Sequence, residues 1–529
     1  MKISFWQGPF RAADVAHNLN QIEAALYKAI QEKSDLFVLP FMALTGYPVG
    51  DYAVDKGFFQ AIEKALLRLK VVREMPILLT YPVRYKNDTQ VRQILLSKGK
   101  ETLLALLDLE GKLLTPRCVV VSIAGVKIEL IYEASFPKKS TSSEGEVFLL
   151  QWVEPFYVGL SEKRQKKAKK FAKEQGKALL AFSALGASGE YLFDGSLWAY
   201  NTRGKVSFKL ASFTGNKPVY WDKKKAIFKG AAIEGKEKIN SLRYKALVFS
   251  LRAFADAVGF SKVCLGLSGG IDSALVLALA YEAFGGKNCE VLLLPSRYTS
   301  DMSNDLALKM ARHLQVKHEI VPIEKSFTAI QGAMAQRFTG LAPDVTEENL
   351  QSRIRGVLLM ALANKTAALL LCTSNKSEEA VGYCTLYGDT NGGFAPIKDL
   401  YKTEVYDLAR WINKHIDKDR IPTGIIERPP SAELSPNQTD EKALMPYARL
   451  DRIIQLIIEN QTPEEIISQG FSKDDVEKVM HWVRQSEFKR QQAPLGPKLS
   501  ERSFGEEWHY PLTRYLKLYK LKKGEMGAF

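Results

Sequence analysis

The sequence predicts an α/β protein with two domains, an N-terminal α+β sandwich and a C-terminal doubly wound parallel sheet. The chain has 529 residues, more than one hydrophobic core usually serves. Strand and helix patterns alternate in the first 230 residues, with turn residues typical of antiparallel pairs, and strand–helix–strand repeats follow. A charged stretch between residues 215 and 240 separates the two patterns, so we expect domains at residues 1–230 and 236–529.

The first domain shows short apolar runs separated by turn residues. Residues 18–32 have apolar side chains at helical spacing, and the lysine-rich run 163–177 is typical of the solvated face of a second helix. Residues 109–112 predict the turn of a hairpin. The expected strands are residues 2–7, 35–40, 75–81, 103–108, 119–122, 126–132, 179–182 and 196–200.

The second domain alternates buried strands with helices. Ligands of such sheets bind beyond the carboxyl ends of the strands, so we expect chemistry after residues 267, 295 and 373. The expected strands end at those residues and at residue 322, and the expected helices are residues 239–257, 274–283, 301–314 and 350–362.

The loop Ser268-Gly269-Gly270-Ile271-Asp272-Ser273 joins the first of these strands to an alanine-rich helix. Free backbone N–H groups and the helix dipole make such a turn an anion site, and glycine lets a phosphate approach the backbone. Asp272 fits a bare phosphate cradle poorly, but it fits a metal ion held between a carboxylate and a polyphosphate. The alternative is an ordinary tight turn between strand and helix.

Polar motifs follow the strand that ends at Thr373. Glu378 is either a carboxylate that stabilises a helix N-terminus or a second carboxylate for the metal of Asp272. Further polar motifs lie at residues 396–403, 428–434 and 487–498.

Composition and charge exclude some classes of protein. The chain is 46% hydrophobic and has no apolar run of 18 residues, so we expect no transmembrane helix, and the N-terminus is typical of a strand rather than a signal peptide. The five cysteines show no paired metal spacing, which indicates reduced thiols and a cytoplasmic protein. The net charge of +15 allows nucleic acid as a partner, but solvated helix faces are the better explanation, and a polyanionic small substrate would also suit a basic protein.

The first domain resembles the nitrilase-like glutaminases. The resemblance rests on four motifs in the family's order, residues 37–48, 125–137, 154–159 and 192–196. That family uses a glutamate base, a lysine and a cysteine nucleophile. Here Phe41 stands at the glutamate position and Tyr132 at the cysteine position, and the lysine segment is missing near residues 113–116. The resemblance therefore implies a degenerate, inactive glutaminase domain.

The second domain resembles the NAD synthetases in their long, glutamine-dependent architecture. The Ser-Gly-Gly-Ile-Asp-Ser loop is similar to that of the wider family of ATP pyrophosphatases. The run from Asn375 to Asp389 and the Pro-Pro-Ser-Ala-Glu-Leu motif at residues 429–434 distinguish NAD synthetases within it.

This resemblance implies amidation of the nicotinate carboxylate of deamido-NAD. ATP activates the carboxylate as an acyl-adenylate, and ammonia then displaces AMP. Asp272, Asp389, Lys402 and Ser431 are the expected catalytic residues, with Asp272 and Glu378 as Mg²⁺ ligands and Asp389 orienting ammonia. The expected ATP contacts are Gly266, Leu267, Ser268, Gly269, Gly270, Ile271, Asp272, Ser273, Arg297 and Thr373; those of deamido-NAD are Asn349, Glu378 and Lys489. Lys402 and Lys489 are alternatively plain solvated lysines.

Because the glutaminase residues are absent, we expect free ammonia rather than glutamine as the nitrogen source. Two alternatives remain open: amidation of deamido-NMN, and an ATP pyrophosphatase that modifies tRNA. ATP and Mg²⁺ are the expected substrate and cofactor. We expect a homo-oligomer with small-molecule substrates, without a nucleic acid or membrane partner.

Overall fold

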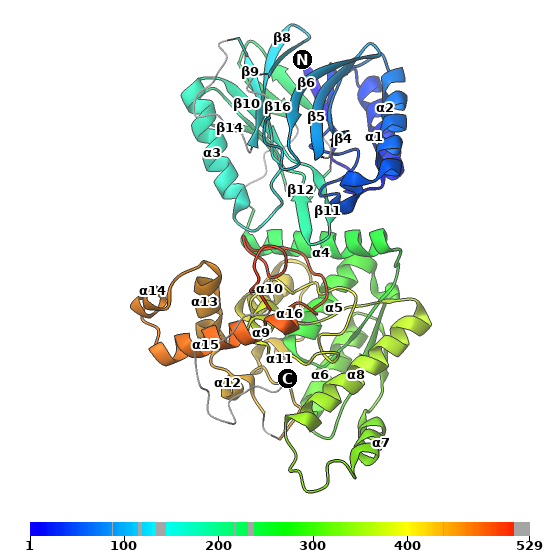
Figure 1. Ribbon diagram of the computed structural model, residues 1–529, viewed down its shortest axis with the longest axis vertical. Coiled ribbons are helices and arrows are strands. Elements are labelled where there is room, and N and C mark those ends of the chain that lie inside the picture. Colours follow the sequence, from blue (N-terminus) through cyan, green and yellow to red (C-terminus); the bar gives the residue numbers. More distant parts are fainter. Residues whose placement is uncertain are drawn as a thin grey trace. The chain divides into compact units, whose positions relative to one another are not determined.

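The structure, a computed structural model, describes residues 1–86, 88–114, 119–133, 144–215, 218–230, 237–436 and 438–512 (Figure 1). The chain forms two compact units, Met1–Leu242 (unit 1) and Arg243–Phe529 (unit 2). The division falls inside helix α4 (Ile239–Val258), a few residues beyond the boundary that the charged stretch suggests.

Unit 1 is an α+β sandwich of two large sheets, as expected. One sheet has the order β16-β15-β1-β3-β4-β5-β6, the other β14-β13-β10-β9-β8-β7, and a small third sheet has the order β12-β11-β2. The strands are β1 (Lys2–Phe5), β2 (Pro9–Arg11), β3 (Leu36–Val38), β4 (Ile77–Tyr85), β5 (Asp88–Ser97), β6 (Lys100–Leu107), β7 (Val119–Ile123), β8 (Val126–Tyr132), β9 (Val147–Gln151), β10 (Ala178–Phe182), β11 (Leu185–Ser188), β12 (Tyr191–Asp194), β13 (Leu197–Tyr200), β14 (Val206–Leu210), β15 (Val219–Asp222) and β16 (Ile227–Gly230).

The core of unit 1 lies between the sheets, where Phe5 of β1 meets Phe182 of β10 at a ring distance of 5.1 Å. Helices α1 (Val15–Gln31) and α2 (Lys56–Val71) cover one sheet, and α3 (Leu160–Gln175) covers the other (Figure 1). Helix α3 buries Phe171 among apolar strand residues while its lysines stay exposed, which confirms the expected solvated face.

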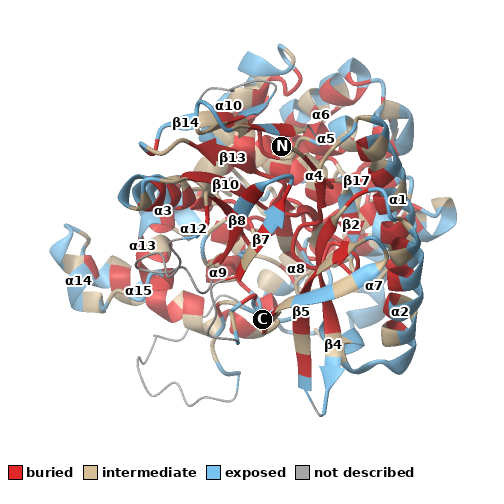
Figure 2. Ribbon diagram, turned by 90° about the horizontal axis from the view of Figure 1, so that it is seen from above, coloured by how far each residue is buried: buried red, intermediate tan, exposed pale blue. Residues whose placement is uncertain are grey.

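Unit 2 is built on a fully parallel sheet with the order β19-β18-β17-β20, which confirms the predicted doubly wound pattern. The strands β17, β18 and β20 are almost entirely buried, whereas the edge strand β19 is mostly exposed. Figure 2 colours buried residues red and exposed residues pale blue. The elements around the sheet are β17 (Val263–Gly266), α5 (Ile271–Phe284), β18 (Cys289–Leu293), α6 (Asp301–His313), β19 (Lys317–Ile320), α7 (Glu324–Met334), α8 (Val345–Thr366) and β20 (Leu369–Leu370).

A second group of helices follows β20 and packs around its own apolar cluster, which includes Leu450, Val479 and Phe504. These helices are α9 (Lys376–Val381), α10 (Lys402–His415), α11 (Thr423–Glu427), α12 (Asp440–Ala443), α13 (Tyr447–Ile458), α14 (Pro463–Ser468), α15 (Lys473–Gln485) and α16 (Glu487–Arg490). Two of them, α9 and α10, begin beside the carboxyl ends of the sheet strands and deliver charged side chains there.

The sequence prediction left out α2, β5 and β9 in unit 1 and α7, α10, α13 and α15 in unit 2. Helix α8 also starts five residues before the expected helix, because the Asp344 and Glu347 side chains form a capping box. Among the described residues, no helix is long and apolar enough to cross a membrane.

Candidate active site

A cavity of about 270 Å³ opens at the carboxyl ends of β17, β18 and β20, where the sequence predicts the chemistry. The segments that follow all three strands line it, and so do parts of α8, α9 and α10 and the segment 428–434. The predicted site residues that line it are Gly266, Leu267, Ser268, Gly270, Ile271, Asp272, Ser273, Thr373, Glu378, Asp389, Lys402 and Ser431.

The loop after β17 has the geometry of an anion cradle. Gly269 has a φ of +78°, and a Cβ built there would lie 2.2 Å from the Ser303 carbonyl oxygen, so a side chain does not fit. The Ser268 hydroxyl accepts a hydrogen bond from the Gly270 N–H at 3.2 Å. Helix α5 begins at Ile271 without a side-chain cap, which leaves its N-terminus suited to an anion.

Three charged side chains meet beside this loop. Lys402 Nζ lies 2.6 Å from Asp272 Oδ2 and 2.9 Å from Glu378 Oε1. Asn375, the N-cap of α9, connects the two acids: its Nδ2 donates to Asp272 Oδ1 at 2.9 Å, and its Oδ1 accepts from the Glu378 N–H at 3.0 Å. The Lys402 side chain is 2% exposed, so it is not a solvated helix lysine.

Burial sets the electrostatics of this cluster. Burial raises the pKa of Glu378 above its ordinary value and the neighbouring Asp272 adds to this, while the Lys402 ammonium opposes the shift and favours the carboxylate. Burial alone would lower the pKa of Lys402, but the Asp272 and Glu378 carboxylates offset this and raise it well above its ordinary value. The lysine therefore stays charged and holds the two acids together.

The two acids also fit a magnesium ion. Among the described residues, no group of three or more His, Cys, Asp or Glu side chains could hold a metal by itself. Mg²⁺ is usually held by only one or two carboxylates, with phosphate and water oxygens as its other ligands. Asp272 and Glu378 already converge on one cation at the edge of the anion cradle, so a metal that arrives with a polyphosphate suits this pair.

Asp389 stands on the loop that follows α9. Its Oδ1 accepts a hydrogen bond from the Thr385 N–H at 2.6 Å, and its own N–H donates to the Ser352 hydroxyl at 3.0 Å. Burial raises the pKa of this carboxyl to about 6, although it borders the cavity. A hydrogen-bonded carboxylate here can orient a small polar reactant.

Asn349 and Lys489 do not line the cavity. The Thr385 hydroxyl donates to Asn349 Oδ1 at 2.7 Å. Lys489 is buried, and its Nζ donates to the carbonyl oxygens of Gly382 and Cys384 at 2.8 and 2.9 Å. Both residues thus hold the loop that leads to Asp389.

Arg297 lies outside the cavity lining. It is half exposed and forms an ion pair with Glu324 of α7. Ser431 does line the cavity, where its hydroxyl donates to the Gln438 carbonyl oxygen at 2.5 Å.

Several cavity residues were not among the predicted site residues. Arg355 is one: its Nε donates to the Leu294 carbonyl oxygen at 2.9 Å, and burial lowers its pKa to about 10. Arg428 is another, and it donates to the Ser303 hydroxyl at 2.6 Å and to Glu433 Oε1 at 3.1 Å. Arg428 directly precedes the Pro-Pro-Ser-Ala-Glu-Leu motif, and Glu433 lies within it. A charged side chain next to a predicted motif was the signal that could have identified both.

Phe41 and Tyr132 are core residues of unit 1. Both are nearly fully buried in its main apolar cluster, and the Phe41 ring packs edge-on against Tyr47 at 5.5 Å. Neither side chain offers a carboxylate or a thiol.

Comparisons with known proteins identify the family of the chain. The NAD synthase family model matches residues 243–493. The chain is 36% identical to the glutamine-dependent NAD(+) synthetase of Xanthomonas campestris, over 97% of each chain, and 38% identical to that of Xylella fastidiosa strain Temecula1, over 97% of this chain and 98% of the relative. A solved structure of the Acinetobacter baumannii enzyme in complex with ADP superposes with a TM-score of 0.77 at 28% identity, covering 96% of this chain and 98% of that one.

One expectation from the sequence is wrong. The relatives that match nearly the whole chain carry names that specify glutamine dependence. This contradicts free ammonia as the nitrogen source and does not support an inactive glutaminase domain. The expectation rested on the residue types at Phe41 and Tyr132 and on a missing segment. These positions alone do not determine whether a whole domain hydrolyses glutamine.

Proposed function

The chain belongs to the family of glutamine-dependent NAD⁺ synthetases, and on that premise we propose that it converts deamido-NAD to NAD in an ATP-dependent amidation. The observation that carries the proposal is the junction of Asp272, Glu378 and Lys402 at the mouth of the Ser268–Ser273 loop. It joins an anion cradle to a cation site, which is what a reaction that releases pyrophosphate needs.

In the first step the nicotinate carboxylate attacks the α-phosphorus of ATP, forming an acyl-adenylate and releasing pyrophosphate. The backbone N–H groups at the start of α5 hold the phosphate oxygens. Lys402 stabilises the negative charge that develops as the bond to pyrophosphate breaks. Arg355 and Arg428 border the same cavity and add positive charge toward a trianionic or tetra-anionic substrate.

In the second step ammonia attacks the acyl carbon and AMP leaves. Asp389 lines the cavity and holds the incoming nitrogen by accepting a hydrogen bond from it. Asn349 and Lys489 act indirectly, because they fix the loop that carries Asp389.

Asp272 and Glu378 would hold the Mg²⁺ ion. The ion would supply charge neutralisation of the phosphate oxygens. The residues themselves position the cradle, since Asn375 ties both carboxylates to the start of α9.

For the nitrogen source we take glutamine, the donor in the relatives' names. Phe41 and Tyr132 cannot supply the base or the nucleophile for its hydrolysis, so other residues of unit 1 have that task.

The test is an assay of the purified full chain with ATP, Mg²⁺ and deamido-NAD, with NAD and AMP separated by chromatography. Glutamine and ammonium chloride are compared as donors at matched concentrations. We expect equal amounts of NAD and AMP with glutamine present, and a loss of both products in Asp272→Asn. If neither donor gives NAD, the synthetase reaction is rejected. If ammonium chloride gives NAD and glutamine does not, glutamine is rejected as the donor. Deamido-NMN serves as the competing substrate in a parallel reaction.

A further inference from the structure

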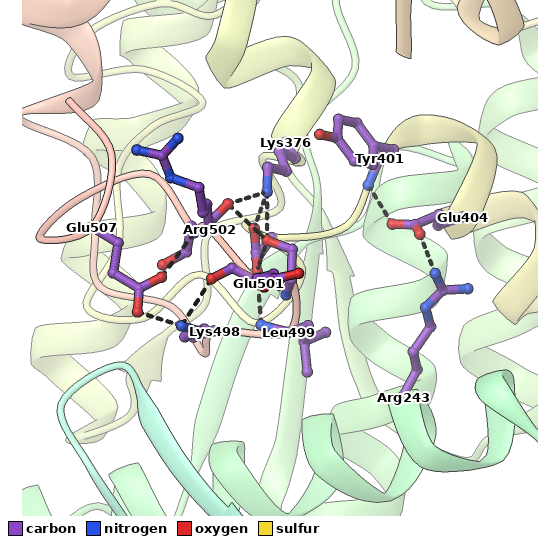
Figure 3. Close-up of polar contacts among 12 residues, drawn as sticks. Arg243, Lys376, Tyr401, Glu404, Lys498, Leu499, Glu501, Arg502 and Glu507 are labelled. Carbon is purple, nitrogen blue, oxygen red and sulfur yellow. Dashed lines mark hydrogen bonds and ion pairs between the residues drawn. The ribbon is translucent and has the colours of Figure 1, made fainter. Parts of the chain in front are cut away.

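Residues 498–502, here called the C-terminal clasp, close over two segments of the synthetase site (Figure 3). Under the clasp lie Lys376, the first residue of α9, and Asp399, which precedes α10. Figure 3 shows Leu499 and Arg502 of the clasp beside Lys376, which lies far from them in the sequence.

The clasp surrounds a buried ion pair. Lys376 Nζ lies 2.6 Å from Asp399 Oδ1, with the two side chains 0% and 4% exposed. Taking two charges out of water is costly, and the cost is offset only when further hydrogen bonds satisfy both groups. The clasp provides those bonds.

Each charge is satisfied by clasp atoms. Lys376 Nζ donates to the Ser500 hydroxyl at 2.6 Å and to the Arg502 carbonyl oxygen at 3.0 Å. Asp399 Oδ2 accepts from the N–H groups of Leu499 and Ser500 at 2.7 and 2.6 Å. The Ser500 hydroxyl also lies 2.8 Å from both Asp399 oxygens, so this one side chain touches both members of the pair.

The same two segments carry the reacting charges. Glu378 follows Lys376 by two positions on α9, and Lys402 begins α10 three positions after Asp399. Backbone bonds join the segments directly: the Lys376 N–H donates to the Leu400 carbonyl oxygen, and the Lys402 N–H donates to the Ser377 hydroxyl, both at 2.8 Å. The clasp therefore holds the same two segments whose side chains Glu378 and Lys402 meet in the site.

A separate brace holds α10 from its other side. Glu404 forms an ion pair with Arg243 and accepts a hydrogen bond from the Tyr401 N–H at 3.1 Å (Figure 3). This brace fixes the start of α10 and also meets α9, because Lys376 Nζ lies 5.2 Å from the centroid of the Tyr401 ring. The clasp is therefore one of several contacts that hold the two helices together, and it is the one that surrounds the Lys376–Asp399 ion pair.

We propose that the clasp is a positioning device for the cation site of the synthetase, with Lys376, Asp399 and Ser500 as positioning residues. Together they set the separation of Glu378 and Lys402, and through it the affinity of the site for the magnesium–nucleotide complex. The inference rests on the proposed function, since it concerns the same site.

The test compares Ser500→Ala, Ser500→Thr and the double variant Lys376→Met/Asp399→Asn in the full chain. Ser500→Ala removes only the hydroxyl that bridges the pair, and Ser500→Thr restores a hydroxyl. The double variant removes both charges without leaving one unpaired, which buried ion pairs often tolerate. Ser468→Ala is the matched control, because Ser468 is an exposed serine on α14 whose hydroxyl bonds only within its own helix.

Two experiments are compared. Electron spin resonance of Mn²⁺ gives the Mn²⁺ concentration that half-saturates the enzyme in the presence of a non-hydrolysable ATP analogue. Steady-state kinetics gives kcat and the KM for deamido-NAD. We expect Ser500→Ala and the double variant to weaken Mn²⁺ binding and to lower kcat, each by about tenfold, which corresponds to 1.4 kcal/mol. The KM for deamido-NAD should change less than twofold, and Ser500→Thr should recover both values.

Wild-type metal binding and kcat in Ser500→Ala would overturn the inference. A second pattern would overturn it as well: Ser500→Ala lowers kcat and the melting temperature, the folded fraction binds Mn²⁺ like the wild type, and Ser500→Thr does not recover kcat. Such a result would mean that Ser500 contributes only to stability. The wild-type chain separates this result from the proposed function: if it forms no NAD, the function fails, while its Mn²⁺ affinity still tests the clasp.

Discussion

Lys402 is the residue on which the site depends most. Its ammonium neutralises two carboxylates at once, and its stem lies near the Tyr447 ring, with Nζ 5.3 Å from the ring centroid. A neutral side chain there would leave Asp272 and Glu378 facing each other without a cation, in a cavity where charge is costly to bury.

We predict that Lys402→Met lowers kcat for NAD formation at least about 100-fold, a typical effect of removing one group that stabilises transition-state charge. The KM for deamido-NAD should change much less. The measurement is steady-state kinetics with saturating ATP, and Lys414→Met at the exposed end of the same helix is the control. A decrease in kcat smaller than tenfold would remove Lys402 from the reaction.

Glu379 is a buried carboxyl without a hydrogen bond in the described part of the chain, although the Lys398, Arg490 and Lys376 cations lower its pKa and so partly offset the effect of burial. It is 2% exposed, and among the described residues neither carboxylate oxygen has a hydrogen-bond donor. Burial raises its pKa to about 7. Such a group costs about 1–3 kcal/mol of stability.

We therefore predict that Glu379→Met, which keeps the volume and removes the polar atoms, raises the free energy of unfolding by about 1–2 kcal/mol at pH 8. Urea unfolding followed by circular dichroism measures the change. Glu319→Met, at an exposed position on the edge strand β19, should leave stability unchanged. Equal effects of the two substitutions would show that burial of Glu379 is not the cause.

At this scale the sequence predicted much of the site and misplaced some of it. Asp272 and Glu378 were expected to hold one Mg²⁺ ion, which stays a prediction. The structure brings the two side chains together at Lys402, because both follow the carboxyl ends of neighbouring parallel strands. Arg297, Asn349 and Lys489 lie outside the cavity lining. A motif gives the position of a residue in the chain, but which way its side chain turns depends on partners such as Glu324 that lie elsewhere in the sequence.

The loop between β17 and α5 is the element with the least freedom to change. Its left-handed Gly269 lies against the backbone of α6, so strain and collision act together there.

We predict that Gly269→Ala weakens binding of an ATP analogue at least about tenfold, equal to 1.4 kcal/mol, because the loop must move to admit the methyl group. Isothermal titration calorimetry measures it. Gly259→Ala is the control, since Gly259 also has a positive φ of +83° but has no atom within 4 Å of its added Cβ. If both variants bind the analogue like the wild type, close approach at Gly269 does not matter.

Helix α15 contains a buried histidine, His481. Burial lowers its pKa, and the Arg484 guanidinium lowers it further, although a hydrogen bond with Gln485 opposes the shift. The folded chain therefore keeps this imidazole neutral at a pH where the unfolded chain binds a proton.

It follows that stability falls as the pH drops through about 6.5, the ordinary pKa of histidine, because the unfolded state then binds more protons than the folded state. We predict that His481→Gln loses less stability than the wild type between pH 7.5 and pH 5.5 in urea unfolding. His509→Gln, at an exposed histidine, is the control. Identical pH dependence of His481→Gln and the wild type would contradict the prediction.

Elements with a regular pattern were predictable, and others were not. Helix α3 and the strands of the parallel sheet follow from lysine-rich and apolar runs. Strand β5 mixes polar and apolar residues, yet it forms ten residues of pairing because β4 and β6 flank it on both sides. That environment is set by the sheet and not by the strand itself.

For the molecule as a whole, all residues that line the cavity belong to unit 2. We predict that a non-hydrolysable ATP analogue with Mg²⁺ slows hydrogen exchange in peptides covering residues 266–273 and 428–434. Peptides from β1 to β14 in unit 1 should keep their exchange rates. Mass spectrometry after brief deuterium labelling measures both, and protection that is confined to unit 1 would contradict this assignment of the nucleotide site.

The two-domain architecture was predictable from the sequence because the first domain shows strand patterns typical of antiparallel pairs and the second shows strand–helix–strand repeats. The nitrogen donor was not. Phe41 and Tyr132 are two buried core residues, whereas the chemistry of a domain depends on every group that reaches its substrate.

The clasp has a consequence for the order in which the chain is made. The ribosome completes Lys376 and Asp399 long before Leu499 and Ser500, so a nascent chain holds two charges whose hydrogen-bonding partners do not yet exist. The buried pair gains these partners only near the end of synthesis. A message cut short after codon 497 would encode every residue of the phosphate loop and the cation site, yet its product would lack the segment that holds them in register.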